Sequence, residues 1–520
     1  MNHSSTSPTE KMAEKPARPF SPSLGKPPFF KSTRSALWVY FLLAGTLLIT
    51  ACARNPVTGN RQLVMMSERQ EIQLGAEYDP QVMATFGAYE NEPLLAFIEE
   101  RGTEMGLISH RPNLEYHFRI LDSPVINAFA VPGGYIYFTR GILAHFNNEA
   151  EMVGVLAHEM GHITARHSVS RQAKQQLGQL LLIGGMIAFE EFREYGAYAM
   201  QGMQLLFLKY SRDDERESDR LGVEYTAKIG YDSQKFGEFF QLLERMNLAS
   251  DHAGIPTLLS THPDPGDRYG TVTELAQVWK DSLGPREWKV NTNSYLQLID
   301  GMVYGEDPRQ GYVEGNTFYH PELLFQFPFP RNWKLENSPM QVRMGPPDGN
   351  ALMIFTFARG NTLAEAAQGT LQQMDLTVRE SRRTTINGMP AIQAVSGQTT
   401  QNQNTGAQQT ISVLSTFIDD DGSYYVFHGV SLQENFNGFL PDFESTMNRF
   451  AKLTDRSKID VNPERIVIRR VDRAGTLADA FRTMGVAQDR MEEFSFLNNM
   501  QLSDRVETGQ LVKIVGGGRR

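Results

Sequence analysis

The stretch Ala150–His167 (AEMVGVLAHEMGHITARH) decides how this chain of 520 residues is interpreted. It contains no proline, has the apolar spacing of a helix, and carries the pattern H-E-x-x-H from His158 to His162. Helical residues four apart share a face, so both imidazoles can reach one metal ion. Glu159 can then act as general base toward an activated water. The pattern predicts a zinc hydrolase site; the alternative is a helix with two buried structural histidines.

A third ligand is expected from elsewhere, because catalytic zinc sites use three protein ligands and keep one position for water. The only cysteine lies far upstream, and Tyr210–Gly222 (YSRDDERESDRLG) supplies Glu215 and Asp219. If this segment is helical, one carboxylate can bind zinc while the other orients a ligand imidazole. A solvated charge run is the alternative. His167 is expected about 140° from the ligand face and is interpreted as structural.

These residues resemble the gluzincin pattern, and the surrounding sequence resembles the HtpX-like peptidases, relatives of the CAAX prenyl endopeptidases and the periplasmic BepA-like proteases. The resemblance covers residues 55–290. It includes Asn127–Leu143, similar to the family's strand before its zinc helix, and Ser260–Arg268 (STHPDPGDR), similar to its downstream histidine loop. The resemblance implies one zinc ion per chain with His158, His162 and Glu215 as ligands, Glu159 as base, and Asp219 behind a ligand.

Two further residues belong to the downstream loop. The resemblance implies that His262 and Arg268 are catalytic and stabilise the transition state. A second interpretation makes His262 a fourth zinc ligand that displaces water and keeps the enzyme latent. A third makes it an ordinary loop histidine. The sequence leaves these alternatives open.

The segment Asn127–Leu143 (NAFAVPGGYIYFTRGIL) carries strand formers at Tyr135–Thr139 after the turn residues Pro132–Gly134. A strand that ends near the zinc helix can pair with an extended peptide by edge addition. A plain hairpin packed on the helix is the alternative. The predicted substrate-binding residues are Asn127, Ala128, Phe129, Gly133 and Gly134.

The N-terminus indicates where the protein works. The apolar run Ala36–Ala51 is shorter than the about 20 residues of a bilayer span and suits a signal peptide. It ends in Ile49–Cys52 (ITAC), which resembles a bacterial lipobox and implies lipidation of Cys52, against the alternative of a short uncleaved anchor. Ala53 after the cysteine favours the outer membrane. The sequence thus predicts a lipoprotein signal peptide at residues 1–51 and a periplasmic, lipid-anchored protein of a Gram-negative bacterium.

Length and charge limit the architecture and the partners. A net charge of −10 disfavours nucleic acid as a partner, and 520 residues imply two or three domains. The predicted fold class is α+β. A mainly helical zincin-type metalloprotease domain with a small edge sheet is expected at residues 52–300, an antiparallel α+β accessory domain at 312–455, and a small βααβ module at 465–516. Within 312–455, strands are expected at Leu324–Phe329, Leu352–Phe357, Ile411–Ile418 and Tyr424–Val430, and helices near 362–377 and 440–453.

The C-terminal segment Arg465–Val515 resembles a lysin-motif module at Val471–Leu477, Phe496–Asn499 and Gly509–Ile514. The resemblance implies binding of N-acetylglucosamine-containing glycans, and therefore peptidoglycan as a partner. Arg473-Ala474 departs from the usual polar start of the first loop. A module used only for packing is the alternative.

Together these features predict a zinc-dependent endopeptidase of the cell envelope. It would hydrolyse misfolded or unassembled envelope proteins, with Glu159 as the base. One alternative is a latched metalloprotease that acts mainly as a chaperone or assembly factor. Another is a peptidoglycan-tethered binding protein, which the intact base and ligands disfavour.

Overall fold

The computed structural model describes residues 52–64, 66–173, 210–249, 258, 261–262, 267–401 and 408–518. The predicted signal peptide lies outside the described residues. Cys52 begins the short strand β1 (Cys52–Arg54), which pairs with β2 (Arg61–Leu63). The fold is α+β with several antiparallel sheets, which confirms the predicted class. Among the described residues, no helix combines the length and the apolar character needed to cross a membrane.

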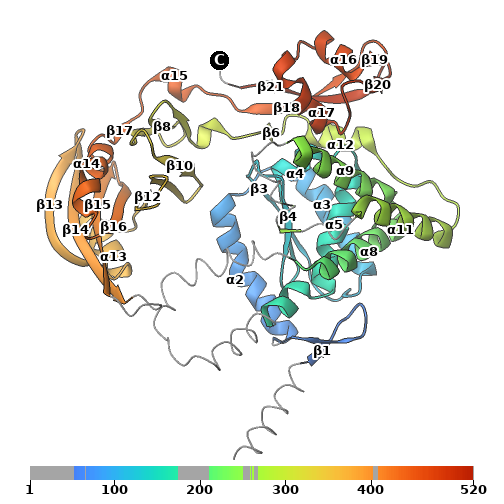
Figure 1. The fold of residues 1–520 in the computed structure, drawn as a ribbon, viewed down its shortest axis with the longest axis horizontal. Coiled ribbons are helices and arrows are strands. Elements are labelled where there is room, and N and C mark those ends of the chain that lie inside the picture. Colours follow the sequence, from blue (N-terminus) through green and yellow to red (C-terminus); the bar gives the residue numbers. More distant parts are fainter. Residues whose placement is uncertain are drawn as a thin grey trace, which may run out of the picture. The chain divides into compact units, whose positions relative to one another are not determined.

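Between Glu68 and Ile299, helices surround a small sheet (Figure 1). The strand order is β3–β5–β4, with β3 (His117–Leu121) parallel and β4 (Ala128–Val131) antiparallel to β5 (Tyr135–Thr139). All of β4 and β5 is buried. The helices are α2 (Glu68–Phe86), α3 (Glu92–Ile108), α4 (Arg140–His145), α5 (Glu149–Thr164), α8 (Arg212–Lys228), α9 (Gln234–Ala249), α11 (Arg268–Leu283) and α12 (Thr292–Ile299).

Helix α5, the predicted zinc helix, is buried along its whole length. It begins after Asn148, whose side chain accepts a hydrogen bond from the Glu151 amide, a favourable N-cap. Two glycines let neighbours approach its backbone. A Cβ on Gly154 would lie 2.4 Å from Phe236 Cβ, and one on Gly161 would lie 3.2 Å from Ser218 Cα. Helices α8 and α9 can therefore pack directly on the helix that carries the H-E-x-x-H residues.

The strand order of this sheet limits which strand an extended substrate peptide could pair with. Strand β5, the predicted Tyr135–Thr139 strand, lies between β3 and β4, so both of its sides are already paired. Among the described strands, a peptide arriving on the Asn127–Phe129 side can pair only with β4. Gly133 and Gly134 have φ of 87° and 101° in the β4–β5 turn, and added Cβ atoms would lie 2.8 Å from Glu71 O and 2.1 Å from Glu115 O. Their glycine character is therefore explained by the turn and its packing.

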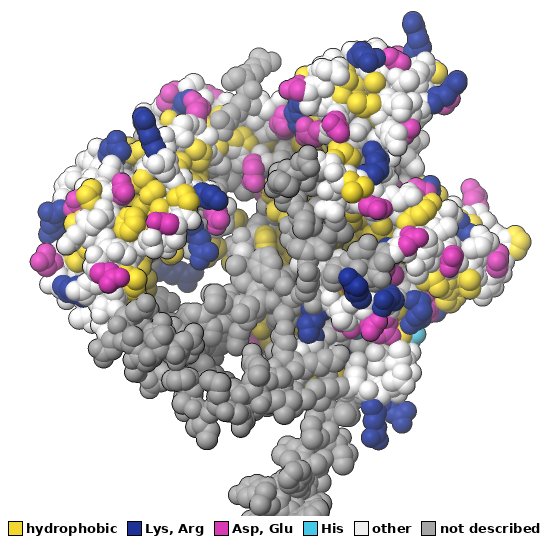
Figure 2. Space-filling model, in the orientation of Figure 1, with side chains coloured by type: hydrophobic (Ala, Val, Ile, Leu, Met, Phe, Trp, Pro, Cys, Tyr) yellow, Lys and Arg dark blue, Asp and Glu magenta, His cyan; other side chains and the backbone are white. Residues whose placement is uncertain are grey.

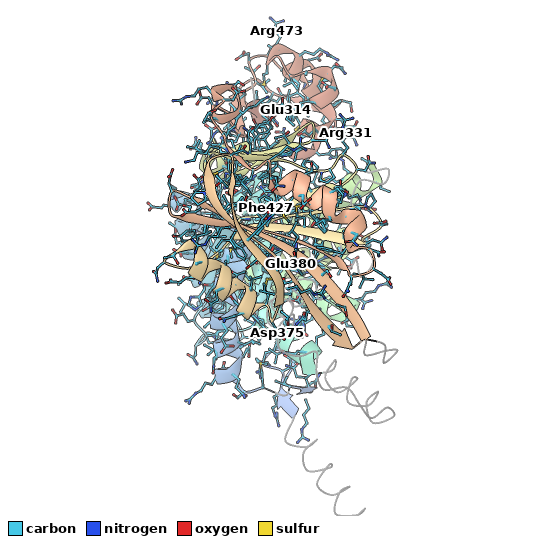
Figure 3. All side chains as sticks on the ribbon, turned by 90° about the vertical axis from the view of Figure 1, so that its left-hand side faces the viewer. Glu314, Arg331, Asp375, Glu380, Phe427 and Arg473 are labelled. Atoms are coloured by element: carbon cyan, nitrogen blue, oxygen red, sulfur yellow. The ribbon has the colours of Figure 1, made fainter. Side chains whose placement is uncertain are left out.

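Residues 303–459 are dominated by antiparallel strands. A four-stranded sheet has the order β17–β9–β8–β7, and a seven-stranded sheet has the order β10–β11–β12–β16–β15–β14–β13. In Figure 3, Phe427 lies in the interior and Glu380 on the outer strand β13. The strand bounds are β7 (Tyr312–Glu314), β8 (Thr317–His320), β9 (Phe325–Pro328), β10 (Lys334–Asn337), β11 (Gln341–Gly345), β12 (Ala351–Phe357), β13 (Thr377–Ile386), β14 (Met389–Gln401), β15 (Gln408–Asp420), β16 (Ser423–Leu432) and β17 (Ala451–Lys452).

The helices of this region are α13 (Leu363–Gln373), α14 (Phe436–Met447) and the short η1 (Pro308–Gln310) and α15 (Arg456–Ile459). Residues of α14 share a buried cluster with β9, β12 and β16, and residues of α13 share a second cluster with β14 and β15. The seven-stranded sheet is thus covered by apolar side chains of both helices.

The last segment follows the predicted order of strand, helix, helix, strand. It consists of β18 (Glu464–Arg470), α16 (Leu477–Thr483), α17 (Met491–Leu497) and β21 (Leu511–Gly517), with η2 (Gln488–Arg490) and the short pair β19 (Gly475–Thr476) and β20 (Arg505–Val506) between them. Strand β18 also pairs with β6 (Val303–Tyr304). The described residues 464–518 are called the C-terminal module below.

Candidate metal centre

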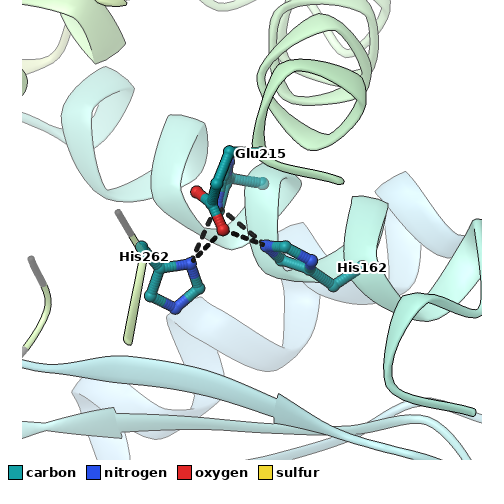
Figure 4. A group of neighbouring side chains, drawn as sticks. His162, Glu215 and His262 are labelled. Atoms are coloured by element: carbon teal, nitrogen blue, oxygen red, sulfur yellow. Dashed lines mark hydrogen bonds and ion pairs between the residues drawn. The ribbon is translucent and has the colours of Figure 1, made fainter. Parts of the chain in front are cut away.

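Four buried side chains from three places in the sequence converge on one point. Figure 4 labels three of them, His162, Glu215 and His262. His158 and His162 come from α5, Glu215 from the first turn of α8, and His262 from the segment between α9 and α11. One ligand atom from each lies within 4.8 Å of all the others. The structure therefore brings together the three predicted ligands and the loop histidine.

Five separations within the cluster are close to those around a tetrahedral ion, and all four ligand atoms lie within 4.8 Å of one another. His158 Nε2 lies 3.1 Å from His162 Nε2, 3.5 Å from Glu215 Oε2 and 3.4 Å from His262 Nδ1. Glu215 Oε1 lies 3.5 Å from His162 Nε2 and 3.1 Å from His262 Nδ1. Zinc bonds of about 2.0–2.2 Å at tetrahedral angles separate ligand atoms by about 3.3–3.6 Å. The donor set of imidazoles and one carboxylate is also what zinc prefers, so these residues fit one zinc ion.

Glu159 is placed as a base would need to be. It is fully buried, and neither of its carboxylate oxygens has a hydrogen-bond partner among the described residues. His262 lies beside it, with Nε2 3.7 Å from Glu159 Oε1. Burial raises the pKa of Glu159 above the ordinary value, and His262 opposes that rise. A buried carboxylate with free lone pairs and a raised pKa is suited to taking and returning a proton.

Asp219 lies behind the ligands. Its Oδ1 is 2.9 Å from His158 Nδ1, the nitrogen that faces away from the cluster. Arg268 donates to both oxygens of Asp219, with Nε 2.9 Å from Oδ2 and Nη2 closer still to Oδ1. Arg268 Nη2 also lies 3.5 Å from Glu215 Oε2, and its guanidinium stacks on Phe240 at 3.8 Å. The arginine thus holds two carboxylates of α8 in place.

The charges of the ligands follow from these neighbours. Burial would raise the pKa of Glu215, but His262 and His158 hold it well below its usual range, so the carboxylate is ionised. Burial lowers the pKa of His162 well below its usual range, so this imidazole is neutral. Burial opposes protonation of His158 as well, yet Asp219 and Glu215 raise its pKa to about 9. A metal binds neutral imidazole, so zinc and a proton compete for His158.

Two neighbours of His162 were not predicted. Its outer nitrogen, Nδ1, lies 3.0 Å from Nδ1 of His167, and Nε2 of His167 lies 3.0 Å from Glu217 Oε2. Tyr210 stacks on the His162 ring with centroids 3.7 Å apart. His167 is not among the four clustered side chains and contacts the outer side of His162, but its place is set by a turn, because α5 ends at Thr164 and Arg166 has a φ of 59°. The chain therefore turns before His167, and extrapolating the helix by 100° per residue fails there.

Part of the sequence is similar to a known peptidase family and to several known proteases. Residues 96–276 match the model of peptidase family M48, a segment that contains every residue of the metal cluster. A beta-barrel assembly-enhancing protease of Escherichia coli (strain K12) is 30% identical over 229 residues, covering 41% of this chain and 45% of that protein. The protein of the same name from Yersinia pestis is 27% identical over 43% of this chain and 48% of its own length.

A more distant relative is the mitochondrial metalloendopeptidase OMA1 of Bos taurus, which is 25% identical over 46% of this chain and 50% of its own length. The chain thus spans half or less of each of these three curated relatives.

Proposed function

Because residues 96–276 match the model of peptidase family M48 and the chain is similar to the beta-barrel assembly-enhancing proteases, we propose that this chain is a zinc metalloendopeptidase. The observation that carries the proposal is the buried cluster of His158, His162 and Glu215, with the unpartnered carboxylate of Glu159 beside it. Bound zinc supplies Lewis-acid polarisation of a carbonyl and lowers the pKa of water toward about 7.

The chain's own residues then perform the proton transfers. Glu159 accepts a proton from the attacking water and returns it to the leaving amine. Its burial without hydrogen bonds keeps the carboxylate available for this exchange. His158 is held in one orientation by Asp219, and His162 by His167, so that both Nε2 atoms face the cluster. Arg268 acts on the site through its contacts with Asp219 and Glu215.

Substrate is proposed to reach the site along strand β4. Ala128 and Phe129 belong to this strand, and its second side has no partner strand among those described. Asn127 precedes the strand, and its side-chain oxygen is buried without a hydrogen-bond partner in the described chain. Because β4 is buried, an extended peptide would have to displace the groups that cover the strand before pairing with its backbone. Gly133 and Gly134 would contribute by shaping the β4–β5 turn.

The wider setting is also proposed from sequence and relatives. The relatives named for beta-barrel assembly support an envelope protein that degrades misfolded or unassembled outer-membrane proteins. Cys52 is proposed as the lipid attachment site of a periplasmic protein at the outer membrane, and the layout as a protease domain (52–300), an accessory domain (312–455) and a βααβ module (465–516). Figure 2 shows acidic and basic side chains interspersed over one face, which argues against a nucleic-acid backbone as its ligand.

The test compares the mature protein with Glu159→Gln on unfolded casein, with zinc assayed in both. Cleavage by the wild type alone, with about one zinc per chain in each protein, is the expected result. Zinc-free protein from both preparations would contradict the metal site. Cleavage by the variant at the wild-type rate would contradict the role of Glu159.

His262 favours a second, latched state of the same enzyme. Its Nδ1 occupies the fourth corner of the cluster, 3.1 Å from Glu215 Oε1 and 3.4 Å from His158 Nε2. A histidine bound there would take the position that catalytic water needs. In that state the protein would act as a chaperone or assembly factor until the His262 segment moves.

A further inference from the structure

A lysine of the C-terminal module is inserted into the protease part of the chain. Lys513 on β21 has no exposed surface. Its ammonium donates hydrogen bonds to the backbone carbonyls of Ala144 at 2.8 Å and Phe146 at 2.9 Å. Burying an ammonium is costly unless its donors are satisfied, so a lysine retained there indicates a contact that the fold depends on.

The two carbonyls end helix α4. Ala144 lies in the last turn of α4 and Phe146 is its C-cap residue; carbonyls at this end lack partners within the helix and carry the negative end of its dipole. Burial lowers the pKa of Lys513 to about 7 and the Glu151 carboxylate opposes this, so the lysine is partly charged at pH 7; its cationic form is favoured at this end of the helix. Lys513, which follows Ala144 by 369 positions, therefore supplies hydrogen-bond donors to the carbonyls at the C-terminus of α4.

Only a short link separates this contact from the zinc helix. Asn147 and Asn148 connect α4 to α5, and both are tied to Glu151 in the first turn of α5. The Asn147 amide donates to Glu151 Oε2 at 2.8 Å, the Asn148 side chain donates to Oε1 at 2.9 Å, and the Glu151 amide donates back to Asn148 at 2.9 Å. Glu151 precedes His158 by two helical turns and so lies on the same face of α5.

The lysine is itself held rigidly. The Lys513 amide donates to Asn498 Oδ1 at 2.7 Å, and Asn498 Nδ2 donates to the Lys513 carbonyl at 2.8 Å. Nearby, Arg245 of α9 donates to Asn499 Oδ1 at 3.2 Å and to the Met500 carbonyl at 2.9 Å. Leu497 and Ile466 of the module belong to the same buried cluster as Leu156 of the zinc helix.

From this chain of contacts we propose that Lys513 is a positioning residue of the metalloprotease, through which the C-terminal module holds the α4–α5 corner that sets the zinc helix. The proposal rests on the proposed function for its catalytic consequence but not for its structural one. On this proposal, the C-terminal module contributes to protease activity by holding the zinc helix in position. Misplacing a catalytic helix by about 1 Å is enough to reduce turnover strongly.

The test uses the full mature chain with Lys513→Met, which keeps the length of the side chain and removes the ammonium. Arg473→Met is the matched control, because Arg473 is an exposed cation at the outer end of the module (Figure 3). Three quantities are measured: amide hydrogen exchange of residues 144–152, zinc affinity by chelator competition, and kcat and KM on unfolded casein.

Lys513→Met is expected to raise exchange at residues 144–152 by about tenfold, and to weaken zinc binding and lower kcat by about three- to tenfold with KM changed less than about twofold. Arg473→Met should match the wild type, and Lys513→Arg should restore part of kcat. Exchange and zinc affinity of Lys513→Met within about twofold of the wild type would overturn the proposal. A wild type that binds zinc but does not cleave casein would contradict the proposed function alone, because exchange and zinc affinity still decide the role of Lys513.

A milder variant covers the case in which Lys513→Met does not fold. Arg245→Met removes the two contacts to Asn499 and Met500 at the edge of the interface and leaves Lys513 in place. It is expected to raise exchange at residues 144–152 by about two- to threefold. Unchanged exchange in this variant would equally overturn the proposal.

Discussion

Removing the Asp219 carboxylate should weaken zinc binding without touching a ligand. Asp219→Ala deletes the contact at 2.9 Å that orients His158, and losing such a partner typically costs about 10–100-fold in metal affinity. This corresponds to about 1.4–2.7 kcal/mol. The Arg268 guanidinium also loses its bonds to Asp219, while Glu215 still lies 3.5 Å from its Nη2. Arg268 then competes with zinc for Glu215, which favours the upper half of that range.

The same change should lower the free energy of unfolding of the zinc-free protein. Removing one partner of a buried ion pair costs about 3–5 kcal/mol, because the other charge stays buried. Asp219 and Arg268 are both buried, so solvent screens this pair little. The assays are chelator competition for zinc and urea unfolding without metal.

The control is Asp213→Ala on the same helix, whose side chain is 92% exposed and pairs with Arg216 at the surface. It should change stability by less than about 1 kcal/mol and leave zinc affinity unchanged. A zinc Kd for Asp219→Ala within about threefold of the wild type would refute the reasoning.

Three further changes test other parts of the structure. His262→Ala should keep about one zinc per chain and raise casein cleavage, since three ligands remain and the fourth position opens; slower cleavage would instead assign His262 to transition-state stabilisation. Gly154→Ala should lower the free energy of unfolding by about 1–3 kcal/mol, because its Cβ would lie 2.4 Å from Phe236 Cβ; an unchanged urea midpoint would contradict this packing. Burial lowers the pKa of His428 to about 4, so the unfolded chain binds the extra proton between pH 6.5 and 4. Stability should therefore fall by about 2 kcal/mol from pH 7 to 5, and His428→Gln, which can still bond Ser415, should remove that loss; an equal pH slope in the variant would contradict it.

Local patterns account for the residues that the sequence identified. The helical repeat places His158 and His162 about one turn apart on one face of α5, and Glu215 and Asp219 likewise on α8. The spacing alone therefore predicted which side chains share a face. The strands within β9, β12, β15 and β16 were likewise visible as runs of strand formers. Both kinds of prediction depend on residues only a few positions apart.

Predictions that depended on where elements end or meet were less complete. The contact of His167 with His162 was not predicted because α5 stops at Thr164, and that of Tyr210 because its stacking on His162 requires α8 to pack beside α5. That β5 is central in its sheet depends on β3, which arrives from an earlier segment. The sequence could suggest roles for His262 but not choose among them, since its distance from Glu215 is set by the packing of separate helices.

The sequence by itself determined the chemistry: a helix with two imidazoles and a base, and a second helix with a carboxylate ligand and its support. Only the tertiary structure decided that His262 lies at the fourth corner of the cluster and that Lys513 reaches the carbonyls before the zinc helix. The physical reason is the range of the forces involved. Backbone hydrogen bonding imposes a period that can be read within a few residues, whereas the contacts of a buried side chain depend on the packing of the whole core.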